Sequence, residues 1–403
     1  MNKTVDIRQS LIDKPLPCVK CGSCKALCPV YADQEEEGMG ARGRVVLLKK
    51  FLQGEIGPSE VLDKRIFSCL LCGACNRQCP LGIEITEAVY KARGELKGFN
   101  RNRMLLGMGM NLLLSRLQSG FRLMKFLEQI GGMIPLHRLR LFRELQEMKI
   151  QLPPSPLRSG ETIFRVSQAR GRVAVFAGCT TNFLYPEMGR ALVETLKAMK
   201  YDVLLPQGEV CCGAPLRGLG FEKEAARLAE KNLKTFQGLK VEAVIGLCPT
   251  CVHVIRDEYK SLAGEGVENA VELSRFLSER KGLLRGKKYR GEALGRVVYH
   301  DPCHSLHHLN AGKEPREILA GLGLDLMEAE RGCCGFGGTF RLLYKDISDA
   351  ILWKTLEGYK GADTIVTSCP NCVLQFRSRA KGIRIRHLVE IIEDTVRGAK
   401  HGK

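Results

Sequence analysis

The chain has 403 residues, 44% of them hydrophobic, which suggests two or three domains with buried cores. Its formal net charge is +18, but no basic motif with interleaved aromatic residues accompanies that charge, so we expect no nucleic-acid binding. No segment approaches the roughly 20 apolar residues that a membrane-spanning helix needs.

The start of the chain, residues 1–18, has no apolar core segment and no small-residue cleavage site, so it does not resemble a signal peptide. We therefore expect a cytoplasmic protein. Thiols stay reduced in that compartment, so the 18 cysteines are expected to bind metal rather than to form a disulfide scaffold. Thiolate-bound clusters carry negative charge, which the basic residues would offset.

The run C-x2-C-x2-C-x3-C-P occurs twice, starting at Cys18 and at Cys69. In two-cluster ferredoxins, the first three cysteines of such a run bind one [4Fe–4S] cubane and the fourth binds the other. Zinc is the weaker alternative, because a zinc site needs four ligands and usually takes two distant C-x2-C pairs. The sequence therefore predicts two [4Fe–4S] cubane clusters. The first is assigned to Cys18, Cys21, Cys24 and Cys79, and the second to Cys69, Cys72, Cys75 and Cys28.

The gap between the two runs is longer than in a compact ferredoxin, because 40 residues separate Cys28 from Cys69. Residues 41–55 and 59–72 have apolar side chains at helical spacing. We therefore predict a helical ferredoxin domain over residues 1–98. It would resemble the domain of succinate dehydrogenase iron–sulfur subunits rather than the small β-α-β ferredoxin.

Residues 99–168 are predicted to form a basic helical connector followed by a linker. Leu113, Leu117, Phe121 and Met124 follow an apolar stripe at helical spacing. A basic amphipathic helix can lie on anionic lipid or dock on a partner, and it can equally pack on the chain's own core. Both alternatives stay open, so a peripheral position on the cytoplasmic face of the membrane is one expectation.

The rest of the chain is a duplication. Three stretches recur in the same order, and their cysteines are offset by 124, 122 and 121 residues, which indicates a repeated unit of about 120 residues. We predict two domains, over residues 169–290 and 291–403. Their cysteines are Cys179, Cys211, Cys212, Cys248 and Cys251 in the first, and Cys303, Cys333, Cys334, Cys369 and Cys372 in the second.

Each unit alternates short apolar runs with helical stretches, which is typical of parallel strands covered by helices. Runs that begin near residues 173, 243, 296 and 364 each precede a cysteine, so the thiols are expected past the carboxyl ends of strands. Five thiols exceed the tetrahedral need of zinc, and an unusual iron–sulfur cluster fits better. A thioredoxin-type dithiol at Cys248 and Cys251 and merely buried cysteines are the weaker alternatives.

Four histidines surround Cys303 in the sequence, namely His300, His304, His307 and His308. They are interpreted mainly as loop histidines beside a metal-binding loop. A role as proton donor near a reduced thiolate is the less favoured alternative.

The two units read C-x31-CCG-x34-C-x2-C and C-x29-CCG-x33-C-x2-C. This pattern resembles the cysteine-rich "CCG" domain, and two ferredoxin motifs followed by two such domains resemble the glycolate oxidase iron–sulfur subunit and the related D-type subunit of heterodisulfide reductase. Arg42–Arg44, His300–His304 and Cys333–Gly338 are further similar stretches. The resemblance covers nearly the entire chain. It implies an α+β multidomain protein, with an N-terminal α-helical ferredoxin domain followed by a duplicated α/β cysteine-rich domain.

The resemblance implies an oxidoreductase subunit and leaves two functions open. In glycolate or lactate dehydrogenase complexes, an FAD-containing subunit oxidises the 2-hydroxy acid and the iron–sulfur subunit relays electrons toward a membrane quinone or cytochrome. This is the main prediction.

The alternative comes from heterodisulfide reductases, in which CCG cysteines hold non-cubane [4Fe–4S] clusters that cleave a disulfide. The catalytic candidates would then be Cys211, Cys212, Cys333 and Cys334. Glycolate-type subunits often have incomplete CCG sets, whereas both sets are complete in this chain. That departure keeps disulfide reduction open.

Overall fold

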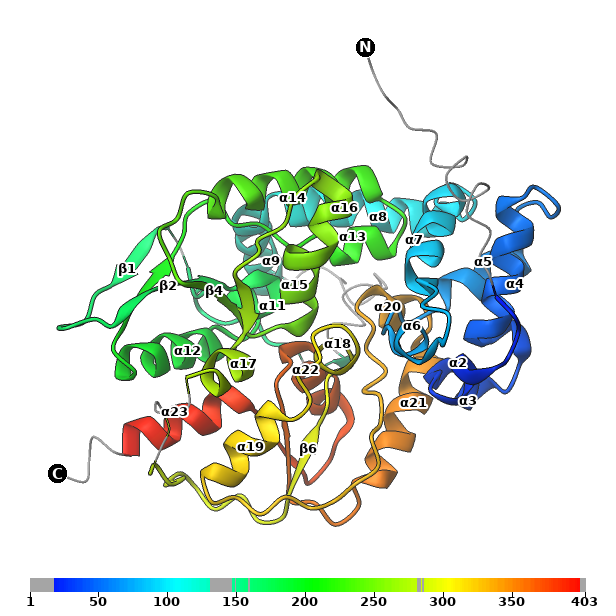
Figure 1. Cartoon of the computed structure of the whole chain (residues 1–403). Helices are drawn as coiled ribbons and strands as arrows, with labels where there is room; N and C mark the ends of the chain where they lie inside the picture. Colours follow the sequence, from blue (N-terminus) through cyan, green and yellow to red (C-terminus); the bar gives the residue numbers. More distant parts are fainter. Residues whose placement is uncertain are drawn as a thin grey trace. The chain divides into compact units, whose positions relative to one another are not determined.

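The computed structural model describes residues 18–130, 147–148, 150–158, 160–280, 284 and 286–398 (Figure 1). The chain divides into two compact units. Unit 1 contains Met1–Gly109, Pro215–Glu222 and Gly335–Trp353, and unit 2 contains Met110–Ala214, Lys223–Cys334 and Lys354–Lys403. Two short segments that the sequence assigned to the repeated domains therefore belong to the unit of the ferredoxin motifs. The first follows a Cys-Cys-Gly triplet, and the second begins at the glycine of the other triplet.

Unit 1 is helical throughout its described residues. Helices α4 and α5 fill the gap between the two cysteine runs, which confirms the helices predicted there. Leu48, Ile66 and Val89 lie in a core against which Tyr344, from late in the chain, also packs. The elements are α2 (Ser23–Ala26), α3 (Pro29–Gln34), η1 (Glu37–Met39), α4 (Ala41–Leu52), α5 (Glu60–Phe67), α6 (Ala74–Gln78), α7 (Ile85–Leu96), the first part of α8 (Arg101–Ser115), most of α13 (Ala214–Gly218), α20 (Thr339–Leu343) and most of α21 (Lys345–Gly358).

Arg93 is a buried cation that fastens the second cysteine run to a segment from far along the chain. Its guanidinium donates to the carbonyls of Phe67 and Cys69 at 3.0 and 2.6 Å, and to the carbonyl of Gly218 at 2.8 Å. A buried charge is tolerated only when its donors are satisfied, and these carbonyls satisfy them. Arg93 therefore fixes the backbone beside Cys69.

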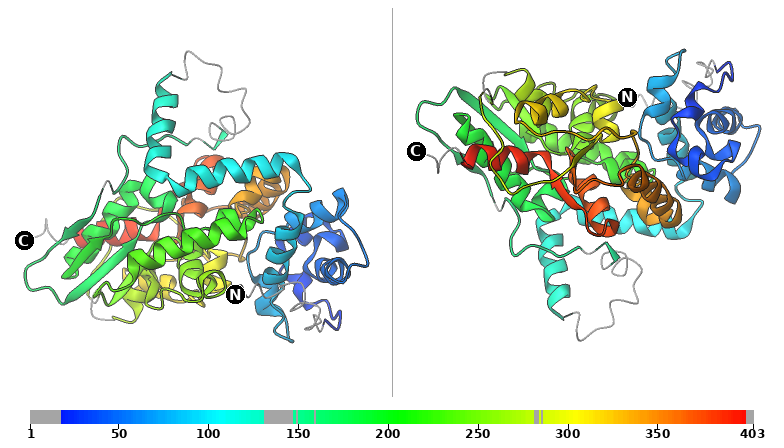
Figure 2. Two further views of the ribbon diagram at one scale, coloured as in Figure 1. Left: turned by 90° about the horizontal axis from the view of Figure 1, so that it is seen from above. Right: turned by 90° about the horizontal axis from the view of Figure 1, so that it is seen from below.

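The predicted basic connector forms α8 and α9 (Leu117–Ile130), while residues 131–146 lie outside the described part. Of the predicted apolar stripe, Phe121 is buried and packs on Phe183 with ring centroids 5.4 Å apart, whereas Leu113 is exposed. In Figure 2, α9 (teal) stands away from the sheet of unit 2. No described helix is both long enough and apolar enough to cross a bilayer.

The first repeat in unit 2 is a mixed sheet with helices around it. The strands run in the order β1-β3-β2-β4-β5, and all neighbouring pairs are parallel except β1 with β3. The strands predicted near residues 173 and 243 are β2 and β4, so both are confirmed. The elements are β1 (Thr162–Phe164), β2 (Gly171–Phe176), α11 (Gly178–Phe183), α12 (Pro186–Ala198), β3 (Tyr201–Leu205), α14 (Glu222–Phe236), β4 (Ala243–Gly246), α15 (Pro249–His253), η3 (Val254–Glu258), α16 (Tyr259–Ala263), β5 (Ala270–Glu272) and α17 (Leu273–Ser278).

The second repeat has the same strand order in a reduced form. Its sheet is β6-β7-β8, and a parallel bridge from Val297 to Leu326 lies on the other side of β6, where β3 lies beside β2 in the first repeat. The strands predicted near residues 296 and 364 are β6 and β7, so these are confirmed as well. The elements are β6 (Val297–His300), α18 (Cys303–His307), α19 (Glu314–Gly321), β7 (Thr364–Thr367), α22 (Pro370–Arg379), β8 (Arg384–His387) and α23 (Leu388–Gly398).

The two repeats exchange contacts within unit 2. Helix α12 of the first packs beside α23 of the second (Figure 1). Glu272 ends β5 and accepts a hydrogen bond from Ser305 of the second repeat at 2.8 Å. His387 ends β8, the matching strand, and its ring lies beside the main chain of Leu247, next to Cys248 in the first repeat. These reciprocal contacts hold the carboxyl ends of the two sheets together.

Replacing Glu272 by glutamine is expected to stabilise the protein above neutral pH. Burial raises the pKa of Glu272 to about 7, against 4.5 for an ordinary glutamate. Because the pKa is raised, the folded protein favours the protonated carboxyl group. The contribution of this group to stability therefore falls as pH rises from 4.5 through 7. Burying the charge then costs about 3 kcal/mol, which a neutral glutamine avoids while keeping the contact with Ser305.

Denaturant unfolding at about pH 6 and about pH 8.5 measures this effect, and the gain from Glu272→Gln is expected to grow by about 1 kcal/mol between them. Glu279→Gln is the control, because that side chain is 60% exposed. Equal gains at both pH values would contradict the prediction.

Candidate functional site

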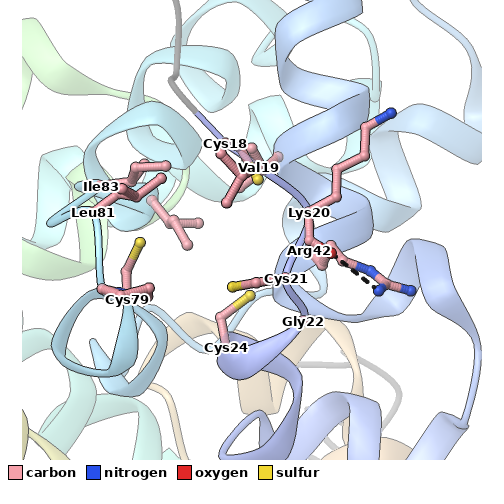
Figure 3. Close-up of a pocket in the computed structure, with 13 residues that line it drawn as sticks. Cys18, Val19, Lys20, Cys21, Gly22, Cys24, Arg42, Cys79, Leu81 and Ile83 are labelled. Atoms are coloured by element: carbon pink, nitrogen blue, oxygen red, sulfur yellow. Dashed lines mark hydrogen bonds between the residues drawn. The ribbon is translucent and has the colours of Figure 1, made fainter.

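The first four-thiol site is a pocket in unit 1 between the two cysteine runs (Figure 3). Three of its thiols come from the loop before α2 and from α2 itself, and the fourth comes from Cys79, at the end of α6. The thiols are Cys18, Cys21, Cys24 and Cys79, the set that the sequence assigned to the first cubane.

The second four-thiol site adjoins the first. Cys28 precedes α3 and lies with Cys69, Cys72 and Cys75 around a second pocket. Ile85 lines both pockets, so one apolar side chain borders both thiol sets. The structure therefore exchanges the fourth cysteines of the two runs, as the sequence predicted, while iron ligation by these eight thiols stays a proposal.

The chemistry of these thiols suits a bound cationic cluster. Burial, followed by the neighbouring Cys18, Cys21 and Cys79, raises the pKa of Cys24. Burial also raises the pKa of Cys75 well above its usual range. Four adjacent thiolates repel one another, so the set ionises together only around positive charge. Four sulfur donors around one small pocket fit a [4Fe–4S] cubane, which takes four cysteine thiolates.

The first five-thiol site lies past the carboxyl ends of β2, β3 and β4. Cys211 hydrogen-bonds Cys179 and Cys212, and Cys212 in turn contacts Cys251. Cys251 contacts Cys248, so the five thiols form a continuous chain. The sequence expectation that these cysteines converge at one sheet edge is therefore met.

A glycine and a proline set the backbone conformation around the thiols of this site. Gly213 has φ +93°, a conformation that other residues rarely adopt, so a glycine after the paired cysteines lets the chain turn away. Cys248 is the N-cap of α15 and Pro249 occupies the first helical position, where its missing N–H costs nothing. Cys248 thus lies at a helix N-terminus, and contacts with Cys251 and Cys369 lower its pKa well below the usual range, whereas contacts with Cys212 and Cys248 raise the pKa of Cys251.

The second five-thiol site repeats this arrangement. Cys303 begins α18 after β6, and Cys369 caps α22, which carries Cys372 in its first turn. The Sγ atoms of Cys372 and Cys334 are 3.3 Å apart. Cys333 is half-buried, and its carbonyl accepts from Thr355 at 2.7 Å.

The two five-thiol sites meet. Cys248 of the first contacts Cys369 of the second. Asn371 donates to the Sγ of Cys248 at 3.6 Å and accepts from Thr180 at 2.8 Å, so one side chain of the second repeat bridges two loops of the first. Neighbouring thiols polarise one another: contacts with Cys211 and Cys251 lower the pKa of Cys212 to about 5. Cys212 is therefore a thiolate at neutral pH, ready to bind metal.

The histidines predicted to surround Cys303 separate into two groups. His304 contacts the Sγ of Cys303 at 3.3 Å, and its ring lies 5.0 Å from that of His308. His300 instead lies near Cys334 and Cys372. The sequence analysis missed His253, whose ring stacks on His308 at 4.0 Å. Its only sequence signal is its position two residues after Cys251.

The charge of His253 is set by two acidic neighbours. Burial opposes a positive charge there, but hydrogen bonds with Asp257 and Glu258 outweigh it and raise the pKa of His253 to about 8. Burial and His253 lower the pKa of His308 to about 3. A charged imidazole therefore stacks on a neutral one where the repeats meet.

Comparison with known proteins matches these sites to two families. Residues 15–83 match the 4Fe-4S dicluster domain, and residues 173–256 and 297–377 match the cysteine-rich domain called CCG.

Three curated relatives span much of the chain. The probable glycolate oxidase iron-sulfur subunit of Bacillus subtilis is 27% identical, across 90% of this chain and 88% of that protein. A fumarate reductase (CoM/CoB) subunit of Methanothermobacter marburgensis is 25% identical, across 93% of this chain and 71% of that protein. An anaerobic glycerol-3-phosphate dehydrogenase subunit of Escherichia coli is 32% identical, across 56% of this chain and 59% of that protein.

Proposed function

Since the chain belongs to the iron–sulfur proteins that join a 4Fe-4S dicluster domain to two CCG domains, we propose that it is an electron-transfer subunit. The complex would be a flavin-dependent 2-hydroxy-acid dehydrogenase of the glycolate or lactate type, similar to the Bacillus subtilis relative. An FAD-containing subunit would oxidise the acid, and electrons would leave toward a membrane quinone or cytochrome. The sequence has one G-x-G-x-x-G match, Gly38–Gly43, but it lies across η1 and the start of α4 instead of following a strand, so it does not have the context of a dinucleotide-binding fingerprint. This is consistent with a separate flavoprotein.

The observation that carries this proposal is the pair of adjoining four-thiol pockets. Clusters held there would accept and pass on single electrons. Ile85 lines both pockets, so the two thiol sets lie close together. Arg93 fixes the backbone beside Cys69 through its hydrogen bond to the carbonyl of that residue. Arg42 lines the first pocket and ion-pairs with Glu37, so a positive group lies beside the thiolates.

The test is a reduction experiment under anaerobic conditions. Glycolate or lactate is expected to bleach the visible absorption of the chain only when the copurified FAD-containing subunit is present. Bleaching by the acid in the isolated chain would contradict the proposal, because the acid would then be oxidised without a flavoprotein. Failure of a reduced FAD-containing subunit to bleach the chain would contradict it too.

Disulfide reduction is the second candidate function. It is favoured by one observation: both five-thiol sets are complete and meet at Cys248 and Cys369. The relative from Methanothermobacter marburgensis carries CoM/CoB in its name and spans the same domains. Reduction of a small disulfide by the isolated chain with an artificial donor would support this function. Loss of that activity in Cys212→Ala or Cys334→Ala would assign it to the five-thiol sites.

We also propose that α8 and α9 contact the membrane surface. Leu112, Leu123 and Phe126 are 65%, 57% and 57% exposed. Arg116, in the turn between α8 and α9, and Arg122, on α9, are exposed as well. Exposed apolar side chains beside cations suit anionic lipid, which attracts the charge and buries the apolar groups.

Introducing two glutamates, as Leu123→Glu with Phe126→Glu, is expected to weaken binding to vesicles containing anionic lipid at least about tenfold. Burying one large apolar side chain contributes roughly 1.5–3 kcal/mol, and the acidic charges add repulsion. Vesicle cosedimentation measures the loss. Gln118→Glu adds charge to α9 without removing an apolar group and serves as the control. Equal binding of the double variant and the wild type would contradict membrane contact through α9.

A further inference from the structure

The two five-thiol sites differ at one buried position. Phe176 ends β2 and pairs in register with Gly246, and His300 ends β6 and pairs with Thr367, so the two residues occupy equivalent places. Phe176 is 2% exposed and His300 is 1% exposed. The first repeat thus has an apolar ring where the second has an imidazole.

His300 lies against the thiols of its own site. One of its ring nitrogens is within 4.8 Å of the Sγ atoms of Cys334 and Cys372. Its Nδ1 is 2.9 Å from the hydroxyl of Tyr359, and its ring packs edge-on against Phe376 at 4.8 Å. The imidazole is therefore held in one orientation from two sides.

The hydroxyl of Tyr359 sets which nitrogen of His300 carries the proton. The phenol can donate the hydrogen bond to Nδ1, which makes Nδ1 the acceptor. The imidazole N–H then lies on Nε2, the nitrogen that Tyr359 leaves available to the thiols. This is the usual way in which an outer hydrogen bond fixes a histidine tautomer.

An N–H group aimed at a thiolate stabilises negative charge on sulfur. A cluster gains one negative charge when it takes up one electron, so hydrogen bonds to its sulfur ligands raise its reduction potential. Phe176 offers no such hydrogen bond in the first site. The difference between the two repeats is therefore a difference in how easily each site accepts an electron.

We propose that His300, oriented by Tyr359, donates its Nε2–H to a thiolate ligand of the second five-thiol site and makes it the higher-potential site of the two. This inference rests on the proposed iron–sulfur content of that site. An electron entering the five-thiol region would then reside in the second site. Tyr359 acts only through His300 and is a positioning residue.

The test is an EPR-monitored redox titration of the anaerobically purified full chain, with iron and acid-labile sulfide measured on every sample. His300→Phe copies the first repeat into the second. The variant is expected to keep its full iron content. The reduction potential of one EPR signal is expected to fall by about 59 mV, which for one electron is a tenfold change in the reduction equilibrium constant. Tyr359→Phe is expected to move the same signal less, and His300→Gln, which retains an N–H donor, to restore part of the shift. Phe176→Leu should move none.

The iron count separates the ways in which this could be wrong. Full iron with an unmoved potential in His300→Phe would overturn the tuning role alone. Loss of about four irons in His300→Phe, with Cys334 and Cys372 intact, would make His300 a ligand rather than a donor. About eight irons in the wild type would leave the second site without a cluster and overturn the inference together with its premise.

Discussion

Replacing Cys21 and Cys79 together by alanine is expected to remove about four irons per chain, whereas replacing Cys21 and Cys28 together is expected to remove about eight. The reason is the exchange of the fourth cysteines between the two runs. Cys21 and Cys79 line the same pocket, so the first pair damages one site only. Cys28 lines the other pocket, so the second pair damages both.

The design separates the exchanged arrangement from its alternative. If each run bound its own cluster, Cys21 and Cys28 would share a site. The variant lacking Cys21 and Cys28 would then lose about four irons, and the variant lacking Cys21 and Cys79 about eight. Alanine is used because serine can still offer an oxygen ligand. Ser23→Ala is the control, since Ser23 contacts the Sγ of Cys21 at 3.5 Å but supplies no thiol to the pocket. Iron and acid-labile sulfide on anaerobically purified protein decide the outcome.

Much of this architecture is readable from spacing alone. The doubled run predicts which four thiols share a pocket, because the fourth cysteine of such runs is known to cross over. The four short apolar runs predict β2, β4, β6 and β7, because each one is long enough for a strand and precedes a cysteine at the expected sheet edge. Local pattern and tertiary structure agree at these points, so simple periodicity suffices.

Other features depend on contacts between segments far apart in the chain. Pro215–Glu222 and Gly335–Trp353 belong to unit 1, although the repeat pattern assigns them to the second half. The carbonyl of Gly218 accepts a hydrogen bond from Arg93, which lies 125 residues earlier in the chain. Periodicity in the sequence cannot predict a contact of this kind. The prediction of an apolar stripe on the connector holds only in part. Phe121 is buried against Phe183, but Leu113 is exposed.

The meeting of the two five-thiol sites is a further case. The sequence indicates five thiols in each repeat, but the contact from Cys248 to Cys369 depends on how the two sheets pack. The same packing brings His253 of the first repeat onto His308 of the second. Duplication makes two similar sites; only the arrangement of the repeats makes them neighbours.

The iron content of the whole chain is expected to be about 16 per molecule, four for each of four sites. The five-thiol sites are as well built for metal as the four-thiol pockets. Cys212 is a thiolate at neutral pH, and contacts with Cys251 and Cys369 lower the pKa of Cys248, which caps a helix. Five clustered thiols, most of them buried in each site, would otherwise leave ionisable groups without a compensating cation.

Cys212→Ala and Cys334→Ala are therefore each expected to lose about four irons, from different sites, and the double variant about eight. Both residues occupy the same place in their repeats, so each variant is the other's matched control. Iron and sulfide analysis with EPR of the reduced protein measures the losses. A wild type with about eight irons, unchanged in both variants, would make the five-thiol domains structural and leave the four-thiol pockets as the only cluster sites. Losses as expected, with a disulfide left unreduced by the isolated chain, would instead favour electron transfer through all four sites.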